Sequence, residues 1–274
     1  MNDQGKKVLF VLSGGGAPGL DIHLGIWRAL SDSGIHATEI SGTSAGAIIG
    51  SLNAFGWSAS SAEDFIRGME ADHIRHERSA WPLRLPWIES IFLNDYIYAM
   101  LSGCLPESWG DIKIPFSAWA CEKRTGTIIN AARPEFAEMP AIAVLASMSI
   151  CGIFPSIRLL DGLFYVDAGY RFNLPLPENW TEFDDVYLLV ATPRPELYIK
   201  NDVVSNLLRN MQIMHKGIVT NVIDRVSRDP RIRVIWPDIH DSTSLLKFNH
   251  NLIDRAYSAT LQIFNGTMDC QAGR

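Results

Sequence analysis

The sequence is poor in cysteine. Only four cysteines occur in 274 residues, they lie far apart, and no two of them form a Cys-x-x-Cys pair. Such spacing argues against a zinc knot or a disulfide scaffold and is typical of proteins in a reducing compartment. The amino-terminal residues MNDQGKK also precede no apolar stretch of the signal-peptide type. We therefore expect a cytoplasmic protein.

An excess of positive charge is also missing. The formal net charge is −6, with 24 Lys and Arg against 30 Asp and Glu. No global basic field attracts nucleic acid, so no nucleic-acid partner is expected. The neighbouring histidines His73 and His76 do not belong to a recognisable set of metal ligands. We therefore expect neither a metal ion nor another cofactor.

No uninterrupted apolar run suggests a transmembrane helix. The two least charged stretches, residues 40–62 and 139–157, are broken by glycine, serine or proline. Breaks of this kind are typical of buried helices flanked by loops.

Short apolar runs alternate with helical patterns along the chain. Strands are predicted at residues 8–12, 39–41, 114–121, 128–130, 157–160, 164–166, 186–191 and 233–236. Helices are predicted at residues 19–32, 45–55, 60–69, 141–149, 203–226 and 251–264. Neither a linker nor a repeat divides the chain. The alternation predicts an α/β fold with parallel strands, formed by residues 1–274 as a single domain.

The segment GTSAG, residues 42–46, matches the pattern Gly-x-Ser-x-Gly between a predicted strand and a predicted helix. In a nucleophile elbow the serine occupies a sharp turn that exposes its hydroxyl at the start of the next helix. The small residues Gly42 and Gly46 allow strand and helix to approach closely. Ser44 is therefore a candidate nucleophile, the alternative being a serine that caps the helix.

A serine nucleophile needs a base, and Asp167 is a candidate. It ends a predicted strand and precedes Ala168 and Gly169, a tight exit from the strand. A carboxylate at the carboxyl end of a strand faces the crevice where α/β proteins bind ligands, and it can act as a general base. A turn-forming aspartate is an equal alternative. By chain order His240 or His250 could complete a hydrolase triad, but the elbow follows an unusually early strand for that fold.

The segment SGGGAPGL follows the first predicted strand and has two interpretations. Gly14, Gly16 and Gly19 have the spacing of a dinucleotide-binding loop. Glu39 follows at about the position where such proteins have the acidic residue that binds the ribose. Alternatively, the amides of Gly15 and Gly16 form an oxyanion hole beside the elbow serine. A phosphate-binding P-loop is excluded, because no Gly-Lys-Ser or Gly-Lys-Thr follows.

Four segments together resemble the patatin-like phospholipase family, in the order in which that family has them. They are SGGGAPGLDIHLGIWRALSDSGI, EISGTSAGAIIGSLNAFG, ASMSICGIFPSIRL and FYVDAGYRFNLPL, all within residues 7–176. The resemblance implies a three-layer α/β/α domain with a mostly parallel sheet, to which residues 177–274 contribute further strands and helices. It also implies a lipid acyl hydrolase that cleaves carboxylic esters of phospholipids, lysophospholipids or simpler lipids.

By the same resemblance Ser44 is the nucleophile and Asp167 is the base, without a histidine or a metal. The amides of Gly14, Gly15 and Gly16 stabilise the tetrahedral oxyanion. Gly42, Gly46 and Gly169 support the turns around the two catalytic side chains.

The chain departs from the family at two positions. Pro18 replaces a usual Arg or Lys and removes one amide, whereas Ala168 is a tolerated variant of a glycine. A protein of the same fold that binds lipid with little catalysis is therefore an alternative, and a nucleotide-binding α/β protein is a weaker one. Trp81, Trp87 and Phe92 belong to an apolar, aromatic segment and are candidates for a peripheral membrane contact, unless that segment packs on the sheet.

Overall fold

The computed structural model describes residues 5–69, 89–90, 92–192, 194–195, 203–241 and 246–266. The strands are β1 (Val8–Leu12), β2 (Glu39–Gly42), β3 (Phe116–Glu122), β4 (Ile128–Asn130), β5 (Ile157–Arg158), β6 (Phe164–Asp167), β7 (Asp185–Leu189), β8 (Arg194–Pro195), β9 (Ile232–Ile235) and β10 (His240–Asp241). The helices are α1 (Gly16–Asp32), α2 (Ala45–Ala54), α3 (Ala59–Arg67), α5 (Asp95–Cys104), α6 (Pro140–Met148), α7 (Gly169–Phe172), α8 (Val203–Val226) and α9 (Asn251–Phe264). Short 3-10 helices span Trp109–Asp111 and Glu178–Glu182.

One large sheet organises the molecule. Its strand order is β5-β6-β3-β2-β1-β7-β9, with β4 beside β3, and β8 pairs separately with β10. The central strands β3, β2, β1, β7 and β9 are parallel. Strands β4 and β6 are antiparallel to β3, and β5 is antiparallel to β6. The prediction of an α/β fold with a mostly parallel sheet is confirmed, and β7 and β9 extend that sheet beyond residue 176.

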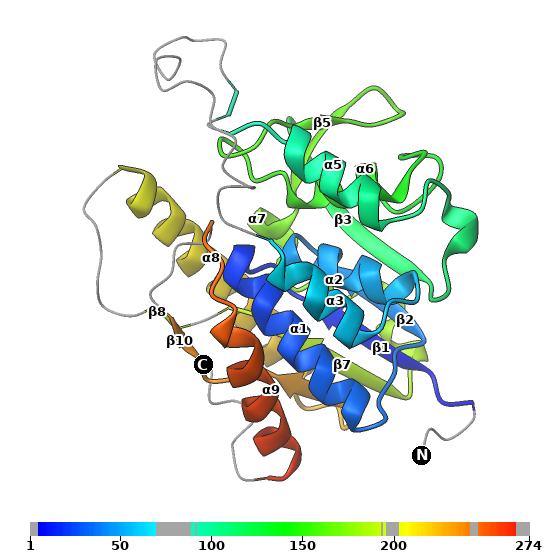
Figure 1. Ribbon diagram of the computed structural model, residues 1–274, viewed down its shortest axis with the longest axis vertical. Helices are drawn as coiled ribbons and strands as arrows, with labels where there is room; N and C mark the ends of the chain where they lie inside the picture. The colour runs from blue at the N-terminus through cyan, green and yellow to red at the C-terminus, as the bar shows by residue number, and fades with distance from the viewer. Residues whose placement is uncertain are drawn as a thin grey trace.

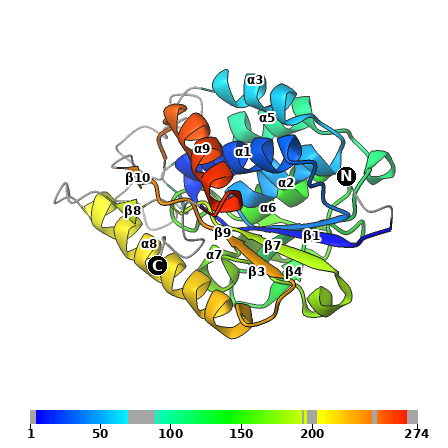
Figure 2. The same cartoon turned by 90° about the horizontal axis from the view of Figure 1, so that it is seen from below.

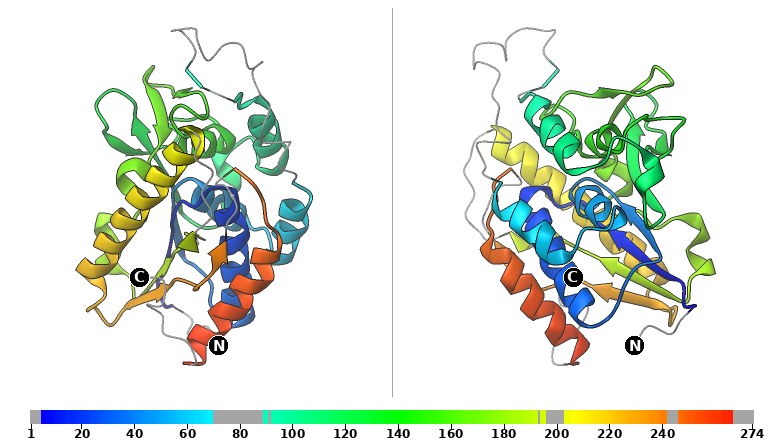
Figure 3. Two further views of the ribbon diagram at one scale, coloured as in Figure 1. Left: turned by 90° about the vertical axis from the view of Figure 1, so that its left-hand side faces the viewer. Right: turned by 45° about the vertical axis from the view of Figure 1, so that its right-hand side comes forward.

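Helices cover both faces of the sheet. In Figure 2, α1, α2 and α9 lie on one side of the sheet and α8 lies on the other, and Figure 3 shows the same arrangement from two further directions. Side chains of β1 alternate accordingly. Phe10 and Leu12 join the larger core on the α1 side, whereas Leu9 and Val11 pack in a second core with Val219 of α8. The molecule therefore has three layers, α/β/α, as expected.

The carboxyl edge of the parallel strands positions the site. Strands β1 and β2 end side by side, with Leu12 paired to Gly42, so the segments that follow them leave the same edge (Figure 1). Strand β3 extends further in this direction, because Ala118 is the partner of Gly42. Asp167 pairs with Ala120, two residues beyond that point. It thus reaches the edge on an antiparallel strand, and not on a parallel strand as the general rule for α/β sheets suggests.

The predicted membrane contact is wrong for Phe92. This residue is only 8% exposed, its amide donates to the Ile153 carbonyl at 2.9 Å, and its ring lies 6.0 Å from that of Phe154. Phe92 therefore belongs to the core. Trp81 and Trp87 lie outside the described residues. In the part of the chain that the structure covers, no helix is both long and apolar enough to cross a membrane.

Candidate active site

Ser44 occupies a strained turn between β2 and α2. Its φ of 55° and ψ of −123° make it the one non-glycine residue with a positive φ in the described parts of the chain. Such backbone is sparsely populated and costs on the order of 1–3 kcal/mol, which the surroundings must offset. Glycines permit the close packing here. A Cβ on Gly42 would lie 2.5 Å from the Gly46 carbonyl oxygen, and one on Gly46 would lie 2.6 Å from that of Ser13.

A second serine holds this turn in place. The backbone amide of Ser44 donates to Ser147 Oγ at 3.1 Å, and the Ser147 hydroxyl donates to the Trp119 carbonyl at 2.7 Å. Ser147 is fully buried on α6, among mostly apolar residues. Its role was not predicted from the sequence. The available signal was a lone hydroxyl in the apolar helical segment PAIAVLASM.

Asp167 faces Ser44 from the end of β6. Its carboxylate lies close enough to the Ser44 side chain to be influenced by it, and it accepts the Gly169 amide at 2.7 Å. The residue is 2% exposed. Burial disfavours the charged form and raises the pKa of Asp167 to about 6, although the Ser44 side chain and the Gly169 amide oppose the rise. A carboxylate with this pKa is mostly ionised at neutral pH and can still accept a proton.

The glycine-rich segment runs past Ser44 into α1. The Gly14 amide donates to the Asn173 carbonyl at 3.0 Å, so that N–H is already engaged. The amides of Gly15 and Gly16 open the helix, where N–H groups lack intrahelical acceptors. Neither amide bonds a described residue outside the helix. Pro18 is the third residue of α1, where its missing N–H leaves no helical bond unmade.

Two further polar side chains lie near Asp167, around Gly169. A Cβ built on Gly169 would lie 3.0 Å from both Asp167 Oδ1 and Asn173 Oδ1, and 3.1 Å from His215 Nε2. Asn173 is fully buried, and its amide group has no hydrogen-bond partner among the described residues. Burial lowers the pKa of His215, on α8, to about 4, so this histidine is neutral near pH 7. His215 was not distinguished from the other histidines in the sequence.

The histidines suggested by chain order have other partners. His250 contacts Asp21 through Nδ1 at 2.8 Å, and His240 lies 3.8 Å from Asp238. His23 is buried, contacts the Ser13 carbonyl through Nε2 at 2.7 Å, and has its pKa lowered to about 4 by burial. Among the described histidines, none is hydrogen-bonded to the candidate nucleophile or base. His73 and His76 lie outside the described residues.

The dinucleotide interpretation does not fit the geometry. Glu39 is the first residue of β2 and pairs with Leu9, whereas the glycine-rich segment follows Leu12. The carboxylate thus starts its strand at the edge opposite to the glycines, and a ribose held by it would not reach them.

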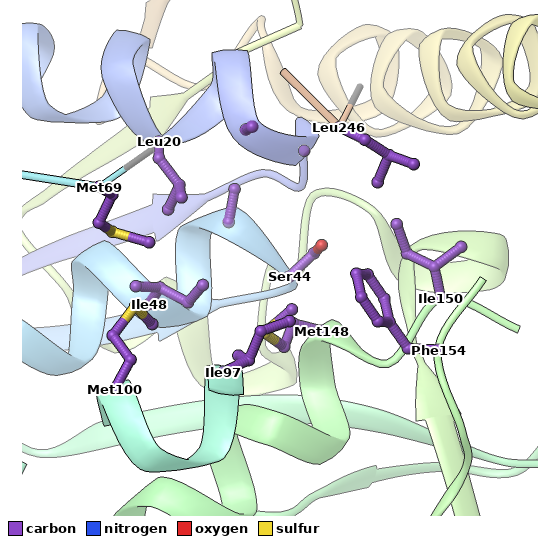
Figure 4. A pocket seen from close by; sticks show the side chains of 13 residues that line it. Leu20, Ser44, Ile48, Met69, Ile97, Met100, Met148, Ile150, Phe154 and Leu246 are labelled. Carbon is purple, nitrogen blue, oxygen red and sulfur yellow. The ribbon is translucent and has the colours of Figure 1, made fainter. Parts of the chain in front are cut away.

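An apolar pocket opens beside Ser44 (Figure 4). Figure 4 shows Met69 and Met100 beside Ile48 at one end, with Phe154 and Ile150 at the other. Ser44 provides the only hydroxyl among the described residues that line it. The lining consists of Gly16, Ala17, Leu20, Ser44, Ala45, Ile48, Met69, Ile97, Met100, Met148, Ile150, Phe154 and Leu246. Such a lining suits a hydrocarbon chain, and methionine adapts to chains of different shape.

Similar proteins are known. The chain is 30% identical over 181 residues to lysophospholipase nte1 of Aspergillus fumigatus, covering 62% of this chain and 11% of that protein. It is 31% identical over 173 residues to patatin-like phospholipase domain-containing protein 7 of Rattus norvegicus, covering 62% of this chain and 12% of that protein. The chain therefore spans about a tenth of the length of these curated relatives.

The fold and a family model agree with these relatives. VipD from Legionella pneumophila has a similar fold, with a TM-score of 0.52 at 14% identity, covering 95% of this chain and 67% of that one. The family model for patatin-like phospholipases matches residues 10–180, which include both Ser44 and Asp167. The chain belongs to the patatin-like phospholipase family.

Proposed function

We propose that this protein is a lipid acyl hydrolase in which Ser44 and Asp167 form the catalytic pair. The observation that carries the proposal is a strained serine beside a buried carboxylate at an apolar pocket. Strain at a buried, polar turn is typical of functional positions. The names of the relatives point to lysophospholipids as one substrate class, and phospholipids and simpler acyl esters have the same reactive group.

In the first half of the reaction Asp167 takes the hydroxyl proton while Ser44 Oγ attacks the ester carbonyl. A tetrahedral intermediate forms, and its negative oxygen is stabilised by the amides of Gly15 and Gly16. Gly14 is not assigned as a donor, because its amide bonds the Asn173 carbonyl. The helix dipole of α1 favours negative charge at the same place. Asp167 then returns the proton to the leaving alcohol or lysolipid, which leaves an acyl-Ser44 ester.

In the second half water attacks the acyl-enzyme. Asp167 accepts a proton from this water, the tetrahedral intermediate forms again, and Ser44 leaves with the proton restored. The carboxylate serves as base in both halves because its pKa of about 6 lies near neutral pH. His215 and Asn173 lie near Asp167, around Gly169, and contribute no charge at pH 7, since burial keeps His215 neutral.

Hydrolysis of a p-nitrophenyl acyl ester tests the proposal. Ser44→Ala and Asp167→Asn are expected to reduce kcat by at least about a thousandfold, the scale of loss when a catalytic group is removed. A fluorophosphonate probe should label wild type at Ser44 and leave Ser44→Ala unlabelled. Ser51→Ala is the matched control, because Ser51 is a buried serine on the same helix that bonds only the Ile48 carbonyl. Wild-type turnover in Ser44→Ala would refute the mechanism.

A further inference from the structure

Ser13 leads directly into the glycine-rich segment, and its side chain is fully buried. The Ser13 hydroxyl accepts the Ala191 amide at 3.0 Å and donates to the Gly14 carbonyl at 3.0 Å. A serine hydroxyl has one proton and two lone pairs, so it can make both hydrogen bonds at once. Ser13 therefore fixes the direction of the Gly14 carbonyl relative to the segment that follows β7.

The Gly14 carbonyl and the Gly15 amide belong to the same peptide group. Every peptide bond of the described residues is trans, so the C=O and the N–H of this planar group point in opposite directions. By holding the carbonyl, Ser13 also fixes the direction of the Gly15 N–H, one of the two donors proposed for the oxyanion. The group lies against the nucleophile, because a Cβ built on Gly14 would be 3.3 Å from Ser44 Cβ.

The other proposed donor is held in a different way. The Gly15 carbonyl accepts the Gly19 amide at 3.1 Å, in the first turn of α1. The Gly16 N–H shares a peptide group with that carbonyl, so the helix itself sets its direction. The two donors thus have separate supports, and loss of the Ser13 hydroxyl should release only the Gly15 N–H.

His23 fixes the peptide group that precedes Gly14. Its ring is fully buried on α1, and Nε2 lies 2.7 Å from the Ser13 carbonyl. Burial lowers the pKa of His23 to about 4, so the ring is neutral near pH 7 and has a single N–H. Because a carbonyl can only accept, this N–H belongs to Nε2. At the other end of the same peptide group, the Gly14 amide donates to the Asn173 carbonyl at 3.0 Å.

The second ring nitrogen of His23 points to a role other than stability. Nδ1 is buried and has no hydrogen-bond partner among the described residues. An unpaired acceptor in the core lowers stability, and a leucine of similar size would avoid that loss. The neighbouring residues Ile22 and Leu24 are buried and apolar. A histidine that lowers stability beside the site is expected where its N–H has a function.

We infer that Ser13 and His23 are positioning residues for the oxyanion hole. They orient two successive peptide groups, so that the Gly15 N–H meets the negative oxygen of the tetrahedral intermediate without having to reorient first. The inference rests on the proposed function, because this oxyanion forms only if Ser44 attacks an ester. Neither residue is among the described residues that line the pocket, so both should affect the transition state and not substrate binding.

Hydrolysis of a p-nitrophenyl acyl ester by Ser13→Ala tests the inference. Removal of an oxyanion donor lowers kcat roughly a hundredfold or more, so a misdirected donor should lower it at least about tenfold and leave KM within about twofold. The pH dependence of kcat should stay that of wild type, because Asp167 is unchanged. Ser51→Ala is the control, since it removes a buried hydroxyl that donates to the Ile48 carbonyl at 2.7 Å, and it should keep the kcat of wild type.

Two substitutions of His23 separate positioning from packing. The amide nitrogen of glutamine reaches about the place of Nε2 and can donate to the Ser13 carbonyl, whereas leucine has no donor. His23→Gln should keep kcat within about threefold of wild type, and His23→Leu should lower it at least about tenfold. Urea unfolding should show His23→Leu to be at least as stable as wild type, so unfolding would not explain its lower kcat. If His23 only fills space, His23→Leu will be the more active variant, and the inference fails.

Inhibition by an aliphatic trifluoromethyl ketone measures the oxyanion hole directly. Ser44 Oγ bonds to the ketone carbon, the hydroxyl proton passes to Asp167, and the ketone oxygen takes the negative charge. The inhibition constant should rise in Ser13→Ala and His23→Leu by about the factor by which kcat falls. The inhibition constant of the corresponding alcohol, which forms no adduct, should not change.

The outcomes distinguish this inference from the proposed function. Unchanged kcat and unchanged ketone inhibition in Ser13→Ala and His23→Leu would overturn the positioning role and leave the catalytic pair intact. A wild type that neither hydrolyses the ester nor reacts with the ketone would refute the proposed function, and the positioning role with it.

Discussion

Replacing Asp167 with asparagine should remove activity and at the same time stabilise the protein. Burial raises the pKa of Asp167 from 3.8 to about 6. This shift of about two units corresponds to a cost of about 3 kcal/mol for keeping the carboxylate ionised in the folded state. Asparagine has the same shape without the charge. If one hydrogen bond is lost, the gain at neutral pH falls to about 2 kcal/mol.

The stability that Asp167→Asn gains over wild type must depend on pH in a defined direction. Between pH 3.8 and about 6 the folded protein holds a proton on Asp167 that the unfolded chain has released. The stability that comes from the protonated form of Asp167 is therefore fully present below pH 3.8. It is lost as the pH rises through about 6 and the buried carboxyl ionises. Between about pH 4.5 and 7.5 the advantage of Asp167→Asn over wild type should grow by about 2 kcal/mol.

Urea unfolding followed by tryptophan fluorescence at several pH values measures this difference. Ser44→Ala gives a second readout, because it removes the hydroxyl that lowers the pKa of Asp167. The pH range over which ionisation of residue 167 destabilises the folded protein should then shift to higher pH. Asp111→Asn, on an exposed 3-10 turn, is the control for a surface carboxylate and should stay within about 0.5 kcal/mol of wild type. A constant difference between Asp167→Asn and wild type across the pH range would refute the reasoning.

Three further outcomes are expected. Ser147→Ala should lower kcat for ester hydrolysis about tenfold with little change in KM, because the Ser44 amide loses its acceptor; an unchanged kcat would contradict this positioning role. Gly46→Ala should destabilise the fold by at least about 2 kcal/mol in urea titrations, since its Cβ would meet the Ser13 carbonyl; near-native stability would show that the elbow can relax. Ile48→Trp should fill the pocket and shift the preferred acyl ester toward shorter chains, as measured by kcat/KM over a chain-length series; an unaltered preference would place the acyl chain elsewhere.

Local patterns were sufficient to predict the elements that build the elbow. The strand at residues 39–41 and the helix at 45–55 agree with β2 and α2 to within a residue, because glycines mark both boundaries. The sequence predicts this helix only from residue 19, whereas α1 begins at Gly16, because glycine and proline at its start are typical of loops. Proline in the first helical turn is compatible with the helix, because the N–H that it lacks would have no intrahelical acceptor there.

Other features depend on contacts between distant parts of the chain. Ser147 bonds a residue 103 positions away, and His215 approaches Asp167 only because α8 packs near α7. No local pattern reports such contacts. Phe92 was misjudged for the same reason, since an aromatic residue in an apolar segment looks alike whether it meets lipid or the ring of Phe154. The segment predicted as a strand at residues 157–160 pairs only over Ile157–Arg158, because the Leu159 carbonyl accepts the Gly162 amide and so already belongs to the turn.

The hydrogen bonds that hold the site lie between elements and not within them. The Ser13 amide donates to the Leu189 carbonyl, the Gly14 amide to that of Asn173, and the Ser44 amide to Ser147 Oγ. Each bond joins the elbow edge to a strand, turn or helix formed much later in the chain. None of them can open by fraying of a single element, so these amide protons should exchange with solvent only when the whole domain unfolds. The arrangement of the candidate site should therefore persist for as long as the whole domain stays folded.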